Sequence, residues 1–294
     1  MERVIHSVKP LMPSFMRKLI GWGSRSIKTT ISRRTGVLPD FIIIGAQKCG
    51  TTSLYQLLVE HPCIYPASTK EVGYFDRYYS GEINWYRAQF PSILRKYYVK
   101  WVRRQEFITG EASTGYILIP HALRRISKVV PRAKLILMLR NPVERAYSHY
   151  HHTVRLGKET LSFEDAIERE RERTSSAWKK MLDDENYWSI DIPQYSYLST
   201  GIYVDQIKLL MKLFSKEQIL ILKFEDFSMD PAGVFKRVLE FLNMPNWELK
   251  DNQGYNVGNY PNMDAAVRKR LVDYFKPYND RLYEYLGATF DWDK

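Results

Sequence analysis

Short apolar runs alternate with amphipathic segments along most of this chain. Three runs are almost entirely apolar, namely Phe41–Ile44, Lys134–Leu139 and Gln218–Lys223. Runs of this length and composition are typical of strands that are buried on both faces. Helical spacing of apolar residues predicts helices over 51–60, from about 143, and over 120–130, 162–180, 203–215, 231–243 and 264–286. The alternation predicts an α/β fold with a parallel sheet flanked by helices.

Neither an internal repeat nor a low-complexity linker interrupts this pattern. We therefore expect one folded domain over 39–294, preceded by an N-terminal arm over 1–38. The polar and aromatic stretch Asp183–Ser199 has weak periodicity, and we interpret it as a long loop or lid over the functional site.

The composition is that of a folded soluble protein. Of 294 residues, 45% are hydrophobic and 26% are charged, which excludes intrinsic disorder, collagen and coiled coil. The longest apolar runs, such as Phe41–Ala46 and Leu135–Leu139, are far shorter than the ~20 residues that span a bilayer. Two cysteines and the lack of a recognisable cleavable signal peptide favour a reducing, cytoplasmic location.

Positive charge is concentrated at the N-terminus. The net charge is +11, of which residues 1–38 carry +7 (eight basic side chains against Glu2) and the rest +4. One interpretation of this arm is a solvated, weakly ordered leader. The other is a basic amphipathic helix on an anionic membrane, because Phe15, Leu19 and Trp22 are interleaved with basic residues. No recognition motif accompanies the charge, so we expect no nucleic-acid partner.

A candidate phosphate loop, Gly45-Ala46-Gln47-Lys48-Cys49-Gly50-Thr51-Thr52-Ser53, follows the first predicted strand and opens a helix. Backbone N–H groups at such a turn and the positive helix terminus attract anions, and the lysine and hydroxyls add donors. A nucleotide-triphosphatase loop places Lys-Ser or Lys-Thr directly after its second glycine, with the hydroxyl on magnesium. Here Gly50 is followed by Thr51-Thr52, which predicts a phosphate site without magnesium.

A second anion site is predicted at the end of the next buried strand. Arg140 follows Leu139 directly, and Ser148 lies about two helical turns farther on. The carboxyl ends of parallel strands open onto one crevice, so both side chains are expected to face one phosphate. Arg145 fits either a further ligand or a helix-surface ion pair. Two phosphate sites without a metal indicate a nucleotide that is phosphorylated at two positions.

These segments resemble the sulfotransferases that use 3′-phosphoadenosine 5′-phosphosulfate (PAPS). The closer resemblance is to the carbohydrate branch, with the heparan sulfate N- and 3-O-sulfotransferase domains and their bacterial relatives. It runs from about Pro39 to Trp292. The segments that carry it are Gly45–Ser53, Arg140–Ser148, Lys70–Asp76, Tyr197–Tyr203 and Tyr260–Asp264.

The resemblance implies a cofactor site, residue by residue. Lys48 through Ser53 would hold the 5′-phosphosulfate, and Arg140 and Ser148 would hold the 3′-phosphate. The full set of implied cofactor contacts is Gly45, Gln47, Lys48, Cys49, Gly50, Thr51, Thr52, Ser53, Arg140, Ser148, Tyr203, Asn259 and Tyr260.

Sulfuryl transfer needs in-line attack by a hydroxyl or amine, a base for its proton, and stabilisation of charge on the departing phosphate. Lys48 can supply the stabilisation. The resemblance implies Glu71 as the base, although the pair Lys70-Glu71 also fits a surface salt bridge. His152 is implied as a secondary base or acceptor contact, and a structural histidine is its alternative.

Metal binding is not expected, because His149, His151 and His152 lack a carboxylate or cysteine at ligand spacing. The chain departs from the resembling glycan enzymes at two places. Ala112 stands where they carry a basic residue, and Asn256–Asn259 lacks the basic residues and cysteines of their C-terminal loop. These losses argue against a highly sulfated glycosaminoglycan as acceptor.

The predicted function is direct, metal-free sulfuryl transfer from PAPS to a hydroxyl or amine of a glycan or small metabolite. The product would be adenosine 3′,5′-bisphosphate (PAP). Two alternatives are a magnesium-dependent nucleotide kinase on a related loop and a non-catalytic nucleotide-binding protein that the arm tethers to a membrane. The acceptor, N- versus O-transfer and the oligomeric state stay open. The aromatic residues of the lid segment fit either stacking on an acceptor or packing on the core: Tyr187, Trp188, Tyr195 and Tyr197.

Overall fold

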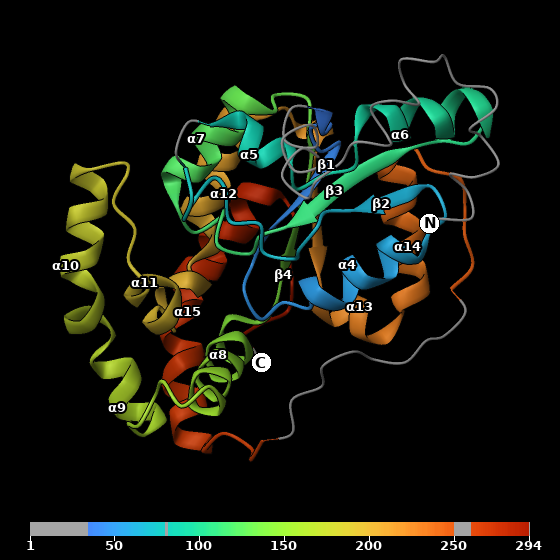
Figure 1. The fold of residues 1–294 in the computed structure, drawn as a ribbon. Helices are drawn as coiled ribbons and strands as arrows, with labels where there is room; N and C mark the ends of the chain where they lie inside the picture. The colour runs from blue at the N-terminus through green and yellow to red at the C-terminus, as the bar shows by residue number, and fades with distance from the viewer. Residues whose placement is uncertain (1–34, 80–81, 250–259, 294) are drawn as a thin grey trace.

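The computed structural model describes residues 35–79, 82–249 and 260–293. Within them, five parallel strands form one sheet in the order β2-β3-β1-β4-β5. The strands are β1 (Phe41–Gly45), β2 (Ile64–Pro66), β3 (Ile108–Ala112), β4 (Lys134–Leu139) and β5 (Ile219–Lys223). Helices cover the sheet, which confirms the predicted α/β class (Figure 1).

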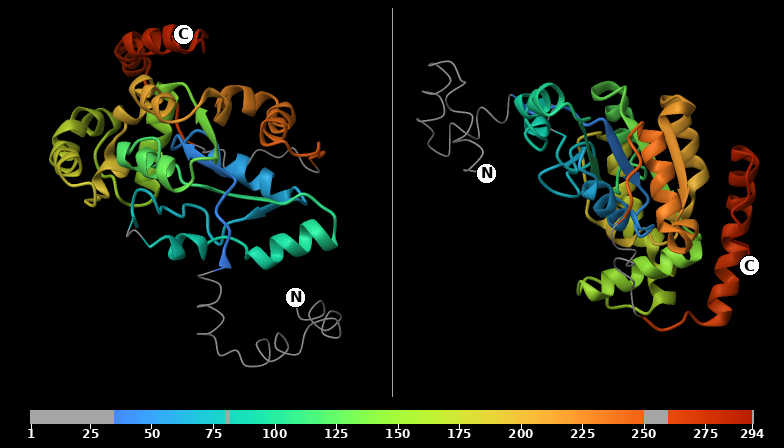
Figure 2. Two further views of the ribbon diagram at one scale, coloured as in Figure 1. Left: turned by 90° about the horizontal axis from the view of Figure 1, so that it is seen from above. Right: turned by 90° about the vertical axis from the view of Figure 1, so that its right-hand side faces the viewer.

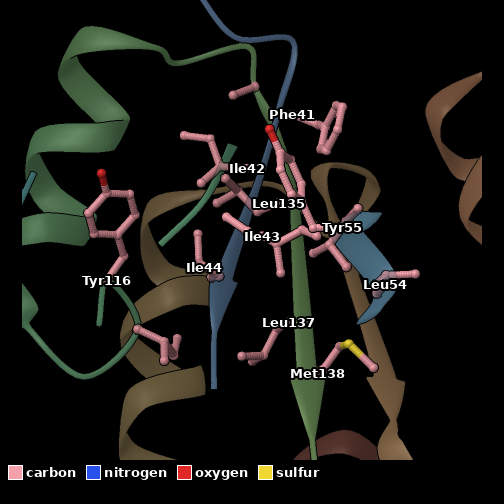
Figure 3. Close-up of a cluster of buried hydrophobic side chains, with 14 of the residues drawn as sticks. Phe41, Ile42, Ile43, Ile44, Leu54, Tyr55, Tyr116, Leu135, Leu137 and Met138 are labelled. Carbon is pink, nitrogen blue, oxygen red and sulfur yellow. The ribbon is translucent and has the colours of Figure 1, made fainter. Parts of the chain in front are cut away.

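The central strand β1 holds the core together. Phe41, Ile42, Ile43 and Ile44 are completely buried, as an apolar strand between two neighbours and two helical layers must be. Figure 3 shows these side chains among residues of β4 and of the helix that follows β1.

Helices lie on both faces of the sheet (Figures 1 and 2). On one face α4 packs against β1 and β3, and α14 packs against α4 and β5; on the other, α12 contacts α7 and α15. Their bounds are α4 (Thr51–Glu60), α5 (Ile83–Arg87), α6 (Ile93–Tyr97), η2 (Tyr98–Val102), α7 (Pro120–Val129), α8 (Pro142–Arg155), α9 (Phe163–Glu168), α10 (Glu170–Asp183), α11 (Asp191–Tyr195), η3 (Ser199–Gly201), α12 (Tyr203–Leu213), η4 (Lys216–Gln218), α13 (Phe224–Met229), α14 (Pro231–Leu242) and α15 (Ala265–Leu286). In the described part of the chain, no helix is both long and apolar enough to cross a bilayer.

The prediction of one helix over 162–180 was wrong in one respect. Ser162 caps α9, and the backbone leaves the helical region at Arg169 (φ −88°, ψ 2°), so two helices occupy this segment. The predicted lid Asp183–Ser199 contains the short helix α11 and is therefore not entirely loop.

Candidate active site

The loop between β1 and α4 has the geometry of an anion cradle. Gly50 precedes the helix with φ 81° and offers no side-chain acceptor to the amides of the first turn. A Cβ on Gly50 would lie 2.8 Å from a ring carbon of Phe224, so both the backbone angle and the available space require glycine. The N-terminal amides of α4 and the positive end of its dipole therefore have no competing side-chain cap.

Lys48 lies at the centre of a cationic cluster. Its backbone is in the left-handed region (φ 70°), and its carbonyl accepts a hydrogen bond from Arg140 Nη1 at 3.3 Å. The Arg140 guanidinium in turn lies over the Phe224 ring, 4.6 Å from its centroid. Burial lowers the pKa of Lys48 to about 8, and the positive charges of Arg155 and Arg140 add to this effect. A bound anion would relieve this repulsion, so the cluster suits a phosphate or sulfate group.

Tyr203 joins the loop to the end of β4. Its buried hydroxyl donates to the Arg140 carbonyl at 2.9 Å and lies 3.9 Å from Cys49 Sγ. Burial raises the pKa of Cys49 to about 11, which keeps this thiol neutral. Tyr203 and Cys49 thus connect the buried part of the phosphate loop to the end of β4. Direct contact of the Tyr203 side chain with a cofactor stays a prediction.

Helix α8 starts immediately beyond Arg140 because Asn141 caps it. The Asn141 side chain accepts hydrogen bonds from the amides of Val143 and Glu144 at 2.9 and 3.4 Å. Glu225 accepts the Asn141 backbone N–H at 2.8 Å, which links this turn to α13. Ser148 follows in α8 and is buried.

Arg145 is completely buried, so its interpretation as a helix-surface ion pair was wrong. Its guanidinium donates to the carbonyls of Tyr197 and Ser196 and lies 3.5 Å from His149 Nδ1. Burial lowers the pKa of Arg145. The residue therefore ties α8 to the segment before η3, and its positive charge contributes to lowering the pKa of Lys48.

His152 lies close to Lys48 on the exposed side of α8. Its Nδ1 accepts a hydrogen bond from Arg155 Nη2 at 3.1 Å, since a guanidinium can only donate. Burial and the charges of Lys48 and Arg155 lower the pKa of His152 to about 4, so the ring is neutral at pH 7. A neutral ring that accepts at Nδ1 carries its hydrogen on Nε2, which makes Nε2 of His152 a hydrogen-bond donor.

The neighbouring histidines have other surroundings. His149 is buried against Tyr197, and His151 stacks on Tyr260 with ring centroids 4.6 Å apart and planes 6° apart. Across residues 35–79, 82–249 and 260–293, no three histidine, cysteine or acidic side chains gather as a metal site would require. Tyr260 is thus placed beside α8, whereas Asn259 lies outside the described residues.

Glu71 is linked to the start of the phosphate loop through Thr114. Its backbone is also left-handed (φ 61°), and its carboxylate accepts from Lys70 Nζ at 2.9 Å and from Thr114 Oγ1 and N at 3.0 Å each. The carbonyl oxygen of Thr114 faces Gly45, where a Cβ would lie only 3.1 Å away. Thr114 therefore contacts the Glu71 carboxylate and also lies next to Gly45 at the start of the phosphate loop. The carboxylate is one-third exposed, so it is oriented and accessible.

The comparisons with known proteins agree with this geometry. A sulfotransferase domain model matches residues 38–267. The chain belongs to the sulfotransferase family. A solved sulfotransferase from Alicyclobacillus acidocaldarius is 29% identical, with a TM-score of 0.65 over 88% of this chain and 100% of that chain. The resemblance carried by Gly45–Ser53 and Arg140–Ser148 is confirmed at the level of the family.

Two curated relatives show the same relationship. The membrane-associated sulfotransferase kil1 of Dictyostelium discoideum is 29% identical over 320 residues, which cover 87% of this chain and 66% of that protein. Mouse heparan sulfate glucosamine 3-O-sulfotransferase 3B1 is 28% identical over 280 residues, which cover 87% of this chain and 65% of that protein. The chain spans about two thirds of the length of these relatives.

A buried carboxyl group that the sequence analysis missed supports the Glu71 side of this sulfotransferase site. Glu111, in β3, accepts hydrogen bonds from the hydroxyls of Tyr86 and Ser113 at 2.6 Å and of Tyr116 at 3.2 Å. The Ser113 and Tyr116 oxygens in turn accept the backbone N–H groups of Gly73 (3.0 Å) and Tyr74 (2.9 Å). Glu111 thus fixes the turn that carries Glu71. A glutamate buried within a strand is the signal that could have identified this network.

Substituting Glu111 by glutamine is expected to flatten the pH dependence of stability. Burial raises the pKa of Glu111 from its ordinary 4.5 to about 7, so the folded state holds this proton more tightly than the unfolded chain does. The resulting stabilisation is complete below pH 4.5 and is lost as the pH rises through about 7. Between pH 4.5 and above pH 7, the free energy of unfolding of the wild type should fall by on the order of 3 kcal/mol relative to that of Glu111→Gln, as measured by denaturant unfolding. Equal pH profiles for the two proteins would contradict this role.

Several lid aromatics pack on the protein itself. Tyr197 is buried and donates to Glu159 at 2.7 Å, and the Arg173 guanidinium lies 3.4 Å from the ring centroid of Tyr195. Trp188 is partly exposed and contacts Arg77 at 5.4 Å. Tyr195 and Tyr197 therefore pack against the protein itself, whereas part of the Trp188 side chain stays exposed to solvent.

Proposed function

We propose that this sulfotransferase moves the sulfuryl group of PAPS to a hydroxyl or amine of a glycan or small-molecule acceptor by direct, metal-free, in-line transfer. The observation that carries the proposal is the cationic cluster around Lys48 at the uncapped N-terminus of α4. An arginine, Arg140, rather than a metal-binding carboxylate, directly follows β4, which supports charge neutralisation by side chains.

The residues present fit the two phosphate groups of PAPS. The backbone from Gly45 to Ser53 and the Lys48 ammonium would hold the 5′-phosphosulfate. Arg140 and Ser148, at the end of β4 and in α8, would hold the 3′-phosphate. The mutual repulsion of Lys48, Arg140 and Arg155 is the feature that an anion of this charge would relieve.

PAPS, when bound, supplies a sulfuryl group on a phosphate leaving group. The Lys48 ammonium would offset the negative charge that develops on that phosphate. The Glu71 carboxylate would accept the proton of the attacking acceptor group, in an orientation set by Thr114 and Lys70. His152 would donate from Nε2 to the acceptor instead of acting as a second base.

The acceptor is proposed as a class only. Ala112, which replaces a basic residue of the resembling glycan enzymes, is completely buried at the end of β3. Removing that positive charge favours an acceptor with fewer sulfate groups than heparan sulfate carries. The division into an arm over 1–38 and a domain over 39–294 is likewise proposed, as is a peripheral location.

The test is transfer of label from sulfur-labelled PAPS to a panel of neutral glycans, amino sugars and small phenols, with a chelator present. Label in an acceptor together with release of PAP, undiminished by the chelator, is the expected result. Phosphoryl transfer from ATP that depends on magnesium would overturn the proposal. PAPS binding without label transfer to any member of the panel would favour the non-catalytic alternative.

A further inference from the structure

One helical segment presents its apolar face to solvent. It comprises α6 and η2 (Ile93–Val102), and here we name it the α6–η2 segment. Leu94, Tyr97, Tyr98 and Trp101 recur at the spacing i, i+3, i+4, i+7, and all four are exposed, Trp101 to 76%. Val99, on the other face, is buried. The segment therefore has an outward apolar stripe in addition to its inward contacts.

Basic side chains border this stripe. Between residues 93 and 106 the chain has Arg95, Lys96, Lys100, Arg103 and Arg104 against the acidic Glu106, a net charge of +4. Lys96 contacts Asp40 at 3.9 Å, and the exposed pair Lys100–Glu106 is 3.7 Å apart. Lys96 is therefore held against the domain, whereas the exposed Lys100–Glu106 pair contributes little and leaves Lys100, Arg103 and Arg104 available to a partner.

The segment lies at the end of the sheet where strands begin. Lys96 reaches Asp40, just before β1, and lies 5.8 Å from the ring centroid of Phe107, just before β3. The candidate active site lies where β1 and β4 end, and Figure 1 shows α6 and α8 toward opposite ends of the strands. Gly36 bridges to Ser92, which caps α6, so the first described residues of the chain lie beside this segment.

We propose that the α6–η2 segment docks this chain on the surface of an anionic phospholipid bilayer. The apolar stripe would enter the headgroup boundary, and the bordering lysines and arginines would face anionic headgroups. Leu94 and Val102 offer nothing to a sugar, which argues against a glycan on this surface. A second copy would bring the same positive charges together, which argues against self-association.

This orientation has a functional consequence. Because the Lys48 cradle is at the other end of β1, docking leaves the site open to the aqueous side. Substitutions in the stripe should therefore leave PAP binding unchanged, which separates this proposal from the proposed function.

The test is sedimentation of the full chain with vesicles of phosphatidylcholine, with and without phosphatidylserine. The wild type should bind the phosphatidylserine vesicles preferentially. Trp101→Ser combined with Tyr97→Ser should weaken that binding at least about tenfold, and Arg103→Ser with Arg104→Ser about fivefold per charge. Met229→Ser, at an apolar side chain that is 78% exposed elsewhere, is the matched control and should bind as the wild type does.

Three results would overturn the proposal. The first is wild-type vesicle binding by the Trp101→Ser, Tyr97→Ser variant, which would place any contact elsewhere, including the arm. The second is equal binding to vesicles with and without phosphatidylserine. The third is a dimer, measured by light scattering, that the same variant dissociates. Thermal unfolding and PAP titration of each variant verify that the domain is folded.

Discussion

Replacing Lys48 by alanine is expected to lower the rate of sulfuryl transfer about 10²–10³-fold. The ammonium lies in a half-buried site near Arg140 and Arg155, where it would contact the leaving phosphate. PAP affinity should fall as well, because PAP retains the 5′-phosphate. Steady-state transfer kinetics and calorimetric titration with PAP measure the two effects.

The pH dependence of PAP affinity provides a second test of the Lys48 ammonium. Lys48 has a pKa of about 8 and must be protonated to hold a phosphate. Affinity should therefore change little between about pH 7, where the phosphates of PAP are ionised, and pH 8, and fall above pH 8 by up to about tenfold per pH unit; Lys48→Ala should lack this decline. Lys128→Ala, an exposed lysine of α7, is the control. A Lys48→Ala variant with wild-type kinetics would contradict the assignment.

Replacing Glu71 by glutamine is expected to lower kcat about 10²–10⁴-fold with little change in PAP affinity. The amide oxygen can still accept from Lys70 or Thr114, so the left-handed turn at residue 71 should persist, but an amide cannot take up the acceptor's proton. Rates and PAP titrations on the same preparations separate the two quantities. Glu217→Gln, at an exposed glutamate, is the control.

Two other outcomes would argue against Glu71 as the base. Unchanged kcat would assign proton removal to another group. A parallel loss of PAP affinity and of folding stability would indicate that Glu71 supports the turn and takes no part in proton transfer.

Continuous apolar runs made the central strands predictable. β1 and β4 are buried on both faces, and the half-buried edge strand β5 still carries the apolar run ILILK, so these sequences alone indicate strands. β3 was missed because its sequence, ITGEA, carries Glu111. Its burial is possible only because hydroxyls from Tyr86, Ser113 and Tyr116 surround the carboxyl group, and these partners are not recognisable before the fold is known. β2 has three residues, too few for any periodicity.

The phosphate loop could be predicted because its chemistry lies within one contiguous segment. Arg145 could not be interpreted correctly, since its partners are carbonyl groups about fifty residues away. The proton position on His152 likewise depends on the side chain of Arg155. Backbone strain at Lys48 and Glu71 leaves no mark in the sequence, because neither residue type favours the left-handed region.

The measurement that tests the central claim most directly is calorimetric titration of the full chain with PAP and with AMP, each without magnesium. The structure predicts tight PAP binding that weakens about tenfold or more when the 3′-phosphate is absent. It also predicts that Arg140→Ala removes this preference for PAP over AMP. Equal affinity for PAP and AMP in the wild type would contradict a site built for a nucleotide with two phosphate positions.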